Sequence, residues 1–130
     1  MLAWHFTNGE KLRDGTPLER RVYRHEGPVQ ICEQGLHYSV RLVDALQYTP
    51  GCVLSRVDVR EVVTEQADKG ACRVREVLCY VDVRDTLVRF ARWCADRAAA
   101  NADAAAYAAD AAAYAADAAA RAAADAADAA

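Results

Sequence analysis

The pattern of hydrophobic and polar positions divides the chain into a mixed first part and a uniform last part. In the first part, strand-like alternation and helical spacing of apolar residues follow one another, with turns rich in Gly, Pro, Asn and Asp between them. From residue 96 onward Ala dominates, and neither Gly nor Pro interrupts it. We therefore predict a head domain over residues 1–95 and an alanine-rich helical tail over residues 96–130.

The head is predicted to have the α+β fold class. Helical spacing of apolar residues predicts a short helix, which Ser39 is placed to cap, and a second helix that begins near residue 85, packs its first turns on the head and continues into the tail. Near Glu76 and Val77 the alternation changes phase, which indicates a β-bulge. We expect a small twisted, mainly antiparallel sheet, one short helix and a long C-terminal helix. The expected strands are residues 2–6, 20–25, 35–39, 52–59 and 72–83, and the short helix is residues 40–47.

Polar residues of the tail recur seven positions apart, and we call them the Tyr/Asp seam. At 100° per residue they occupy an arc of roughly 80° on one side of a helix, and methyl groups cover the rest. Small methyl faces let two helices approach closely, so we expect self-association, as in a coiled coil, through Ala108, Ala112 and Ala115. In such an oligomer the seam faces water, or it faces inward if Tyr hydroxyls donate hydrogen bonds to the carboxylates. The third possible arrangement is a monomeric helix with a frayed end. The seam consists of Tyr107, Tyr114, Arg121 and Asp128, with Asp96, Asp103, Asp110, Asp117 and Asp125.

The charge of the chain is distributed unevenly. There are 16 Lys and Arg against 19 Asp and Glu, and the acidic excess lies in the tail. An acidic tail disfavours nucleic acid as a partner, and repeated Asp disfavours insertion in a membrane. The N-terminus lacks the pattern of a signal peptide, so we expect a cytoplasmic protein.

Cysteine, histidine and aromatic residues give no local signature of chemistry. The five cysteines lack zinc-type spacing and are expected to be reduced core residues, and the three histidines lie far apart, so no metal site is predicted. Six aromatic side chains are expected in the core: Trp4, Tyr23, Tyr38, Tyr48, Tyr80 and Trp93.

Several strings in the head resemble one family of small domains. They are CEQGLHYS at residues 32–39, DALQYTPG at 44–51, the pair Asp68-Lys69 and FARWCA at 90–95. Together they resemble uncharacterised domains of bacterial and phage proteins, which often carry alanine-rich tails. The resemblance implies a phage-type or bacterial accessory protein in the cytoplasm of a bacterial host. We expect a binding and assembly module without a cofactor, with a host-modulating or counter-defence role and a host protein as candidate partner.

A more distant similarity points to an enzyme. The order of His5 on an early strand, Tyr38 on a strand before a helix and Glu76 on a later strand is similar to that in the ADP-ribosyltransferase-like fold. This resemblance implies an NAD-dependent ADP-ribosyltransferase in which His5 holds the NAD ribose, Tyr38 stacks on nicotinamide and Glu76 stabilises the oxocarbenium ion. The two hypotheses differ in one respect, because only the enzyme needs these three residues in one cleft.

Overall fold

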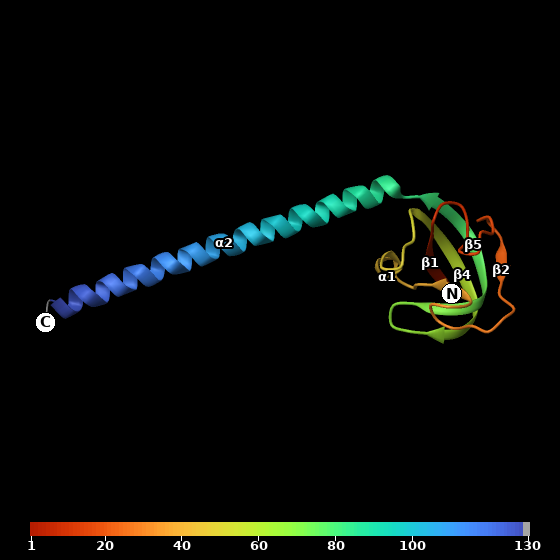
Figure 1. The fold of residues 1–130 in the computed structure, drawn as a ribbon, viewed down its shortest axis with the longest axis horizontal. Coiled ribbons are helices and arrows are strands. Elements are labelled where there is room, and N and C mark those ends of the chain that lie inside the picture. Colours follow the sequence, from red (N-terminus) through yellow and green to blue (C-terminus); the bar gives the residue numbers. More distant parts are fainter. Residues whose placement is uncertain (129–130) are drawn as a thin grey trace. The chain divides into compact units, whose positions relative to one another are not determined.

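The computed structural model describes the backbone of residues 1–128 and the side chains of residues 1–113 and 116. The chain divides into two compact units, Met1–Leu87 and Val88–Ala130, so the division falls ahead of the boundary predicted at residue 95. The first unit, the head, holds an antiparallel sheet and a short helix, and a long helix follows (Figure 1). The predicted α+β fold class is confirmed.

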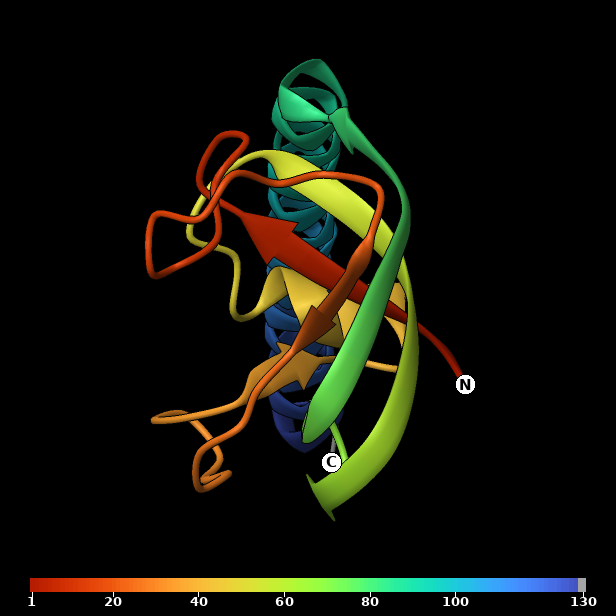
Figure 2. The same ribbon diagram turned by 90° about the vertical axis from the view of Figure 1, so that its right-hand side faces the viewer.

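The sheet of the head has five strands, all paired antiparallel. Two long, strongly curved strands form its centre, β4 and β5, as Figure 2 shows. β1 pairs with the free edge of β4, while β2 and β3 both pair with the other edge of β5. The strands are β1 (Leu2–Thr7), β2 (Val22–Arg24), β3 (Leu36–Tyr38), β4 (Val53–Glu65) and β5 (Gly70–Asp82).

The two ends of the sheet meet, because β1 also contacts the chain just after β3. The Trp4 N–H donates to the Ser39 carbonyl at 2.8 Å, and the Ser39 N–H donates to the Trp4 carbonyl at 3.0 Å. Ser39 is therefore not the helix cap that the sequence predicts, since its backbone completes the sheet. The helix α1 (Leu42–Leu46) begins after Arg41 without a side-chain cap. This closure places His5 beside the β3 strand.

A β-bulge near the predicted position bends the central hairpin. Arg56 pairs with Cys79 and Val57 pairs with Val77, so Leu78 is an extra residue in β5. A second shift in register lies nearer the turn of the hairpin. Bulges increase local twist and bending, which is why these long strands curve around a shared interior.

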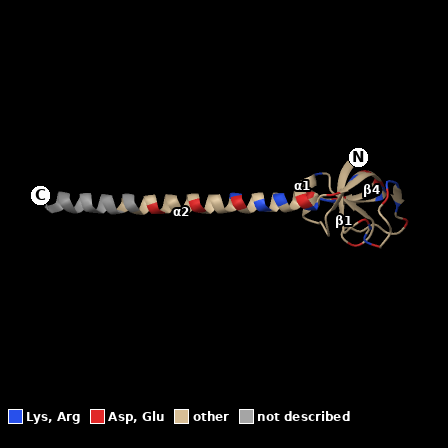
Figure 3. Ribbon diagram, turned by 90° about the horizontal axis from the view of Figure 1, so that it is seen from above, with Lys and Arg blue, Asp and Glu red and all other residues tan. Residues whose placement is uncertain are grey.

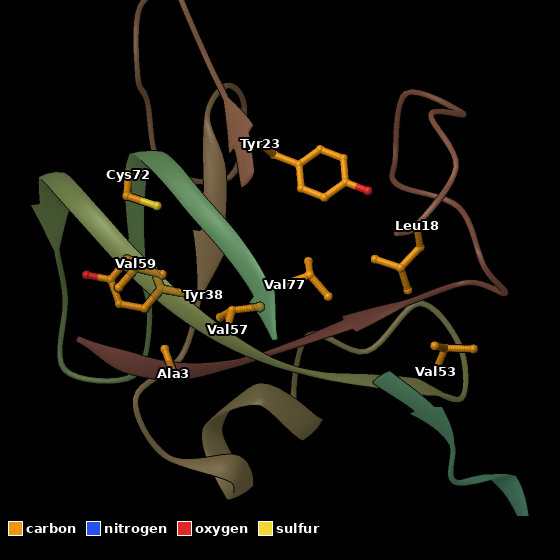
Figure 4. Close-up of a cluster of buried hydrophobic side chains, with 9 residues drawn as sticks. All are labelled: Ala3, Leu18, Tyr23, Tyr38, Val53, Val57, Val59, Cys72 and Val77. Atoms are coloured by element: carbon orange, nitrogen blue, oxygen red, sulfur yellow. The ribbon is translucent and has the colours of Figure 1, made fainter. Parts of the chain in front are cut away.

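The core lies inside this curved sheet (Figure 4). The Tyr38 ring packs directly against Gly70, where a Cβ atom would lie only 2.4 Å from the ring. All five cysteines are free, but only Cys72 is in the core. The expectation of five core thiols is wrong, since Cys32, Cys79 and Cys94 are exposed. The buried cluster consists of Ala3, Leu18, Tyr23, Tyr38, Val53, Val57, Val59, Cys72 and Val77.

The helix α2 (Arg84–Asp128) begins one residue before the predicted start. Its first turns were expected to pack on the head, but their apolar side chains are exposed: Val88 by 44%, Phe90 by 49% and Trp93 by 55%. They contact neighbours in the helix instead: Phe90 stacks on Trp93 with ring centroids 6.1 Å apart, and Arg97 lies 5.2 Å from the Trp93 ring centre.

Charged residues are spaced along the described part of the tail (Figure 3), and its described side chains are exposed. Ala108 and Ala112 are exposed, Tyr107 is 78% exposed, and the side chain of Ala115 lies outside the described residues. Among the helices described, none has the length and apolar character needed to cross a membrane.

Candidate functional site

The head contains a cavity of about 670 Å³ beside the meeting point of β1 and β3, and we call it the Tyr38 cavity. Its walls come from β1, β3 and α1, from the loops that follow β1 and α1, from the loop before β3, and from the β4–β5 turn. A volume of roughly 300–1,000 Å³ is typical of sites for small molecules. The closure of the sheet thus creates a space suited to a small ligand.

Two of the residues predicted as catalytic, His5 and Tyr38, line this cavity. Burial raises the pKa of Tyr38 to about 12, and the negative charge of Glu65 adds to this effect. The Tyr38 hydroxyl donates to Glu65 Oε1 at 3.4 Å. The Tyr38 phenol is therefore a neutral hydrogen-bond donor over the whole physiological range.

Both histidines of the cavity are held neutral. Burial lowers the pKa of His5 well below its usual value, and the positive charge of Arg75 lowers it further. The pKa of His37 is lowered by the same two causes in the same order. His37 Nε2 accepts a hydrogen bond of 2.9 Å from the Cys32 N–H, which assigns the ring proton to Nδ1. These rings offer the cavity neutral donors and acceptors.

Glu76, the third predicted catalytic residue, does not line the cavity. Its carboxylate pairs with Arg60, and across the sheet it lies opposite Asp58 and Val22. The carboxylate that contacts Tyr38 is that of Glu65. The structure therefore brings together two of the three residues that the transferase hypothesis requires.

A pair of cations meets at Cys32 on the wall of the cavity. Lys69 Nζ lies 2.9 Å from Cys32 Sγ, and Arg13 Nη1 donates to the Cys32 carbonyl at 3.4 Å. Lys69 also lies 4.4 Å from the centre of the Tyr48 ring. Contact with Cys32 raises the pKa of Lys69, so this ammonium group stays charged. Cys32 has a positive φ of 69°, a conformation unusual for residues other than glycine.

Next to the cavity residue His37, the head buries a guanidinium group. Arg75 is only 3% exposed, and its Nη1 donates to the His37 carbonyl at 2.6 Å. Among the described residues its Nε has no hydrogen-bond partner. Burial lowers the pKa of Arg75 to about 10, which still leaves it charged at neutral pH. A buried cation of this kind is costly unless a negative group offsets it.

Sequence reasoning did not single out the cations of the cavity wall, Lys11, Arg13 and Lys69, or the buried Arg75 beside His37 as site residues. Lys69 is in the short β4–β5 turn and its neighbour Gly70 pairs with Tyr38, so the register of β3 on β5 brings this lysine to the cavity. No local sequence motif predicts how β3 aligns with β5. Tyr48 also belongs to the cavity wall and is exposed, contrary to the expectation that it is a core residue.

Comparison of the chain with family models, with curated proteins and with solved structures found no match. Within the described residues, His, Cys, Asp and Glu form no group of three that could hold a metal ion. The geometry of the head is therefore the basis for the function proposed below.

Proposed function

We propose that the protein is a binding and assembly module of phage or bacterial type. The head recognises a ligand or a host partner through the Tyr38 cavity, and α2 brings copies of the chain together. One observation carries this proposal: the cavity lies within the unit Met1–Leu87, whereas α2 exposes a methyl face.

Binding is a better account of the head than group transfer. An NAD-dependent transferase needs a carboxylate that faces the sugar beside His5 and Tyr38. Glu76 pairs with Arg60 instead, and Glu65 is engaged by the Tyr38 hydroxyl without lining the cavity. The neutral histidines, the Tyr38 hydroxyl and the cations can all hold a ligand without a chemical step.

Self-association is the role that best explains the surface of α2. Alanine stabilises the helix itself. The apolar side chains of Val88, Phe90 and Trp93 are nevertheless exposed, and contact of apolar surface with water is unfavourable. A second copy packed on the methyl face would cover Phe90 and Trp93, which lie on or near that side of the helix, and the small methyl groups would let the two backbones approach closely. The Tyr/Asp seam would then remain in water, where its carboxylates keep their hydration.

Light scattering coupled to size exclusion tests the assembly role. Replacing Ala108, Ala112 and Ala115 by Glu should lower the mass of the oligomer, because three carboxylates would be buried against a neighbouring helix. The matched control places three glutamates on the side of the Tyr/Asp seam, as Ala99→Glu, Ala100→Glu and Tyr107→Glu, and should keep the wild-type mass.

Two results of this experiment would contradict the proposal. An unchanged mass in the Ala108, Ala112 and Ala115 variant would remove the methyl face as an interface, and a lower mass in the control alone would place the seam inside the oligomer. An assay for nicotinamide release from NAD, run on the same samples, separates the two functions. A binding module releases none, whereas a transferase would hydrolyse NAD slowly.

A further inference from the structure

We propose that the Tyr38 cavity binds a small organic anion, whose phosphate or carboxylate group lies beside Lys69 and Arg13 and whose apolar body lies against the wall that β1 and α1 form. This inference rests on the binding role proposed for the head. It is independent of self-association, so either can fail while the other holds.

The first support is the cluster of cations at one place on the cavity wall. Lys69 and Arg13 both contact Cys32, the former at its sulfur and the latter at its carbonyl, so their charges lie near each other. Lys11 is a third cation of the lining. None of the three forms an ion pair among the described residues. Their charges are thus free to hold an anionic group.

The second support is the lack of acidic residues among those that line the cavity in the described part of the chain. Two carboxylates contact lining side chains: Glu65 accepts from the Tyr38 hydroxyl and Asp68 from the Tyr48 hydroxyl. Both histidines of the wall are neutral at pH 7. The three cations of the lining outnumber these two carboxylates, so the net charge around the cavity is positive and favours an anion over a cationic ligand.

The third support is Arg75, whose charge is buried next to the cavity residue His37. It has no ion pair among the described residues, and its Nε lacks a hydrogen-bond partner there. Removing this charge from water costs free energy that one hydrogen bond to a carbonyl does not offset. An anion bound in the cavity on the other side of His37 would offset part of this cost.

The remaining wall explains why the ligand is an organic molecule. Trp4, Phe6, Leu12, Ala45 and Pro50 present apolar surface to the cavity. An inorganic anion would leave this surface in contact with water, whereas a ligand with an apolar body would cover it. The volume of about 670 Å³ accommodates a molecule of nucleotide size.

Cys32 provides a reporter for the test, because its sulfur contacts Lys69 in the cavity wall. Alkylation of the full-length protein by iodoacetamide is followed by peptide mass spectrometry, with exposed Cys79 and Cys94 as internal controls. Two matched pairs of probes are used, AMP with adenosine and phenylacetate with 2-phenylethanol, and inorganic phosphate is added as a fifth. The pairs separate a phosphate ligand from a carboxylate ligand.

We expect the anionic member of at least one pair to slow alkylation of Cys32 by about tenfold at ten times its Kd. Its neutral partner should have little effect, and the rates at Cys79 and Cys94 should not change. The proposal is overturned if neither anion protects Cys32, if a neutral partner protects equally, or if inorganic phosphate alone protects as well as the organic anions.

Variants identify the cations that hold the ligand. In Lys69→Met and Arg13→Met the ratio of Cys32 rates with and without the anion should fall towards one. This ratio cancels any change in the intrinsic reactivity of the thiol. The control Arg24→Met removes a cation that pairs with Glu61 outside the cavity, and it should keep full protection. Protection that survives both Lys69→Met and Arg13→Met would overturn the assignment.

Discussion

The head and α2 are stabilised by opposite kinds of interaction. In the head, β4 and β5 form a hairpin, but the other strand pairings join residues far apart in the chain, such as Leu2 with Asp58 and Val22 with Glu76. In α2 the hydrogen bonds join residues four apart, and its described side chains beyond Leu87 are exposed. Local sequence therefore determines α2, whereas the head and its cavity exist only when distant strands are in register.

This difference also determines where chemistry can occur. The head can bury Arg75 and lower the pKa values of His5 and His37, because a closed sheet excludes water from them. A single exposed helix has no interior in which to do this. The proposed roles follow from the same contrast, with ligand recognition in the head and assembly on α2.

The largest effect is expected from removing the tyrosine around which the sheet closes. Tyr38→Ala should lower the free energy of unfolding of the head by about 3–5 kcal/mol, since it empties a buried aromatic site. The matched change Tyr107→Ala removes an exposed ring from α2 and should change stability by less than about 0.5 kcal/mol. Hydrogen exchange read by mass spectrometry reports β5 and α2 separately.

We expect faster exchange in β5 of the Tyr38→Ala variant while exchange in α2 stays as in the wild type. Loss of protection in both regions would show that the two units unfold together. That result would contradict the contrast between long-range and local stabilisation.

The same contrast explains what could be predicted from the sequence. The change of phase near Val77 predicted the bulge that the structure has at Leu78, and the switch to helical spacing predicted the start of α2 within one residue. These features leave local signals. Strand β2, Val22–Arg24, is shorter than predicted, although the backbones of Arg21 and His25 on either side of it still hydrogen-bond to Val77 and Arg73 of β5.

The candidate site was only partly predictable. His5 and Tyr38 could be proposed because each lies on a strand with a recognisable pattern, and both line the cavity. Glu76 also lies on a predicted strand, but the register of β5 on β4 pairs it with Arg60. Lys69 lies in a turn, and its contact with Cys32 depends on how β3 pairs with β5. The sequence alone does not encode these distances in any local pattern.

A proline in α2 should affect the helix alone. Ala106→Pro removes a hydrogen bond and introduces a clash with the preceding turn, at a cost of about 3 kcal/mol to the helix. We expect a weaker circular dichroism signal at 222 nm and faster exchange on the N-terminal side of residue 106. The control Ala106→Gln keeps a good helix former and should leave both unchanged. Faster exchange in β4 or β5 would show that the head depends on the helix.

The smallest effect is expected from acid, and it should be confined to the head. The pKa of His5 is lowered in the folded state, so below about pH 6.5 the unfolded chain binds a proton that the folded head excludes. Stability is therefore complete above this pH and falls as the pH is lowered, by at most about 1.4 kcal/mol per pH unit for one histidine. Urea unfolding at pH 7.5 and 5.5 measures this loss in the free energy of unfolding. The loss should be smaller in His5→Gln and unchanged in the control His25→Gln, since His25 does not line the cavity. An equal loss in wild type and His5→Gln would show that His5 is not kept neutral by the fold.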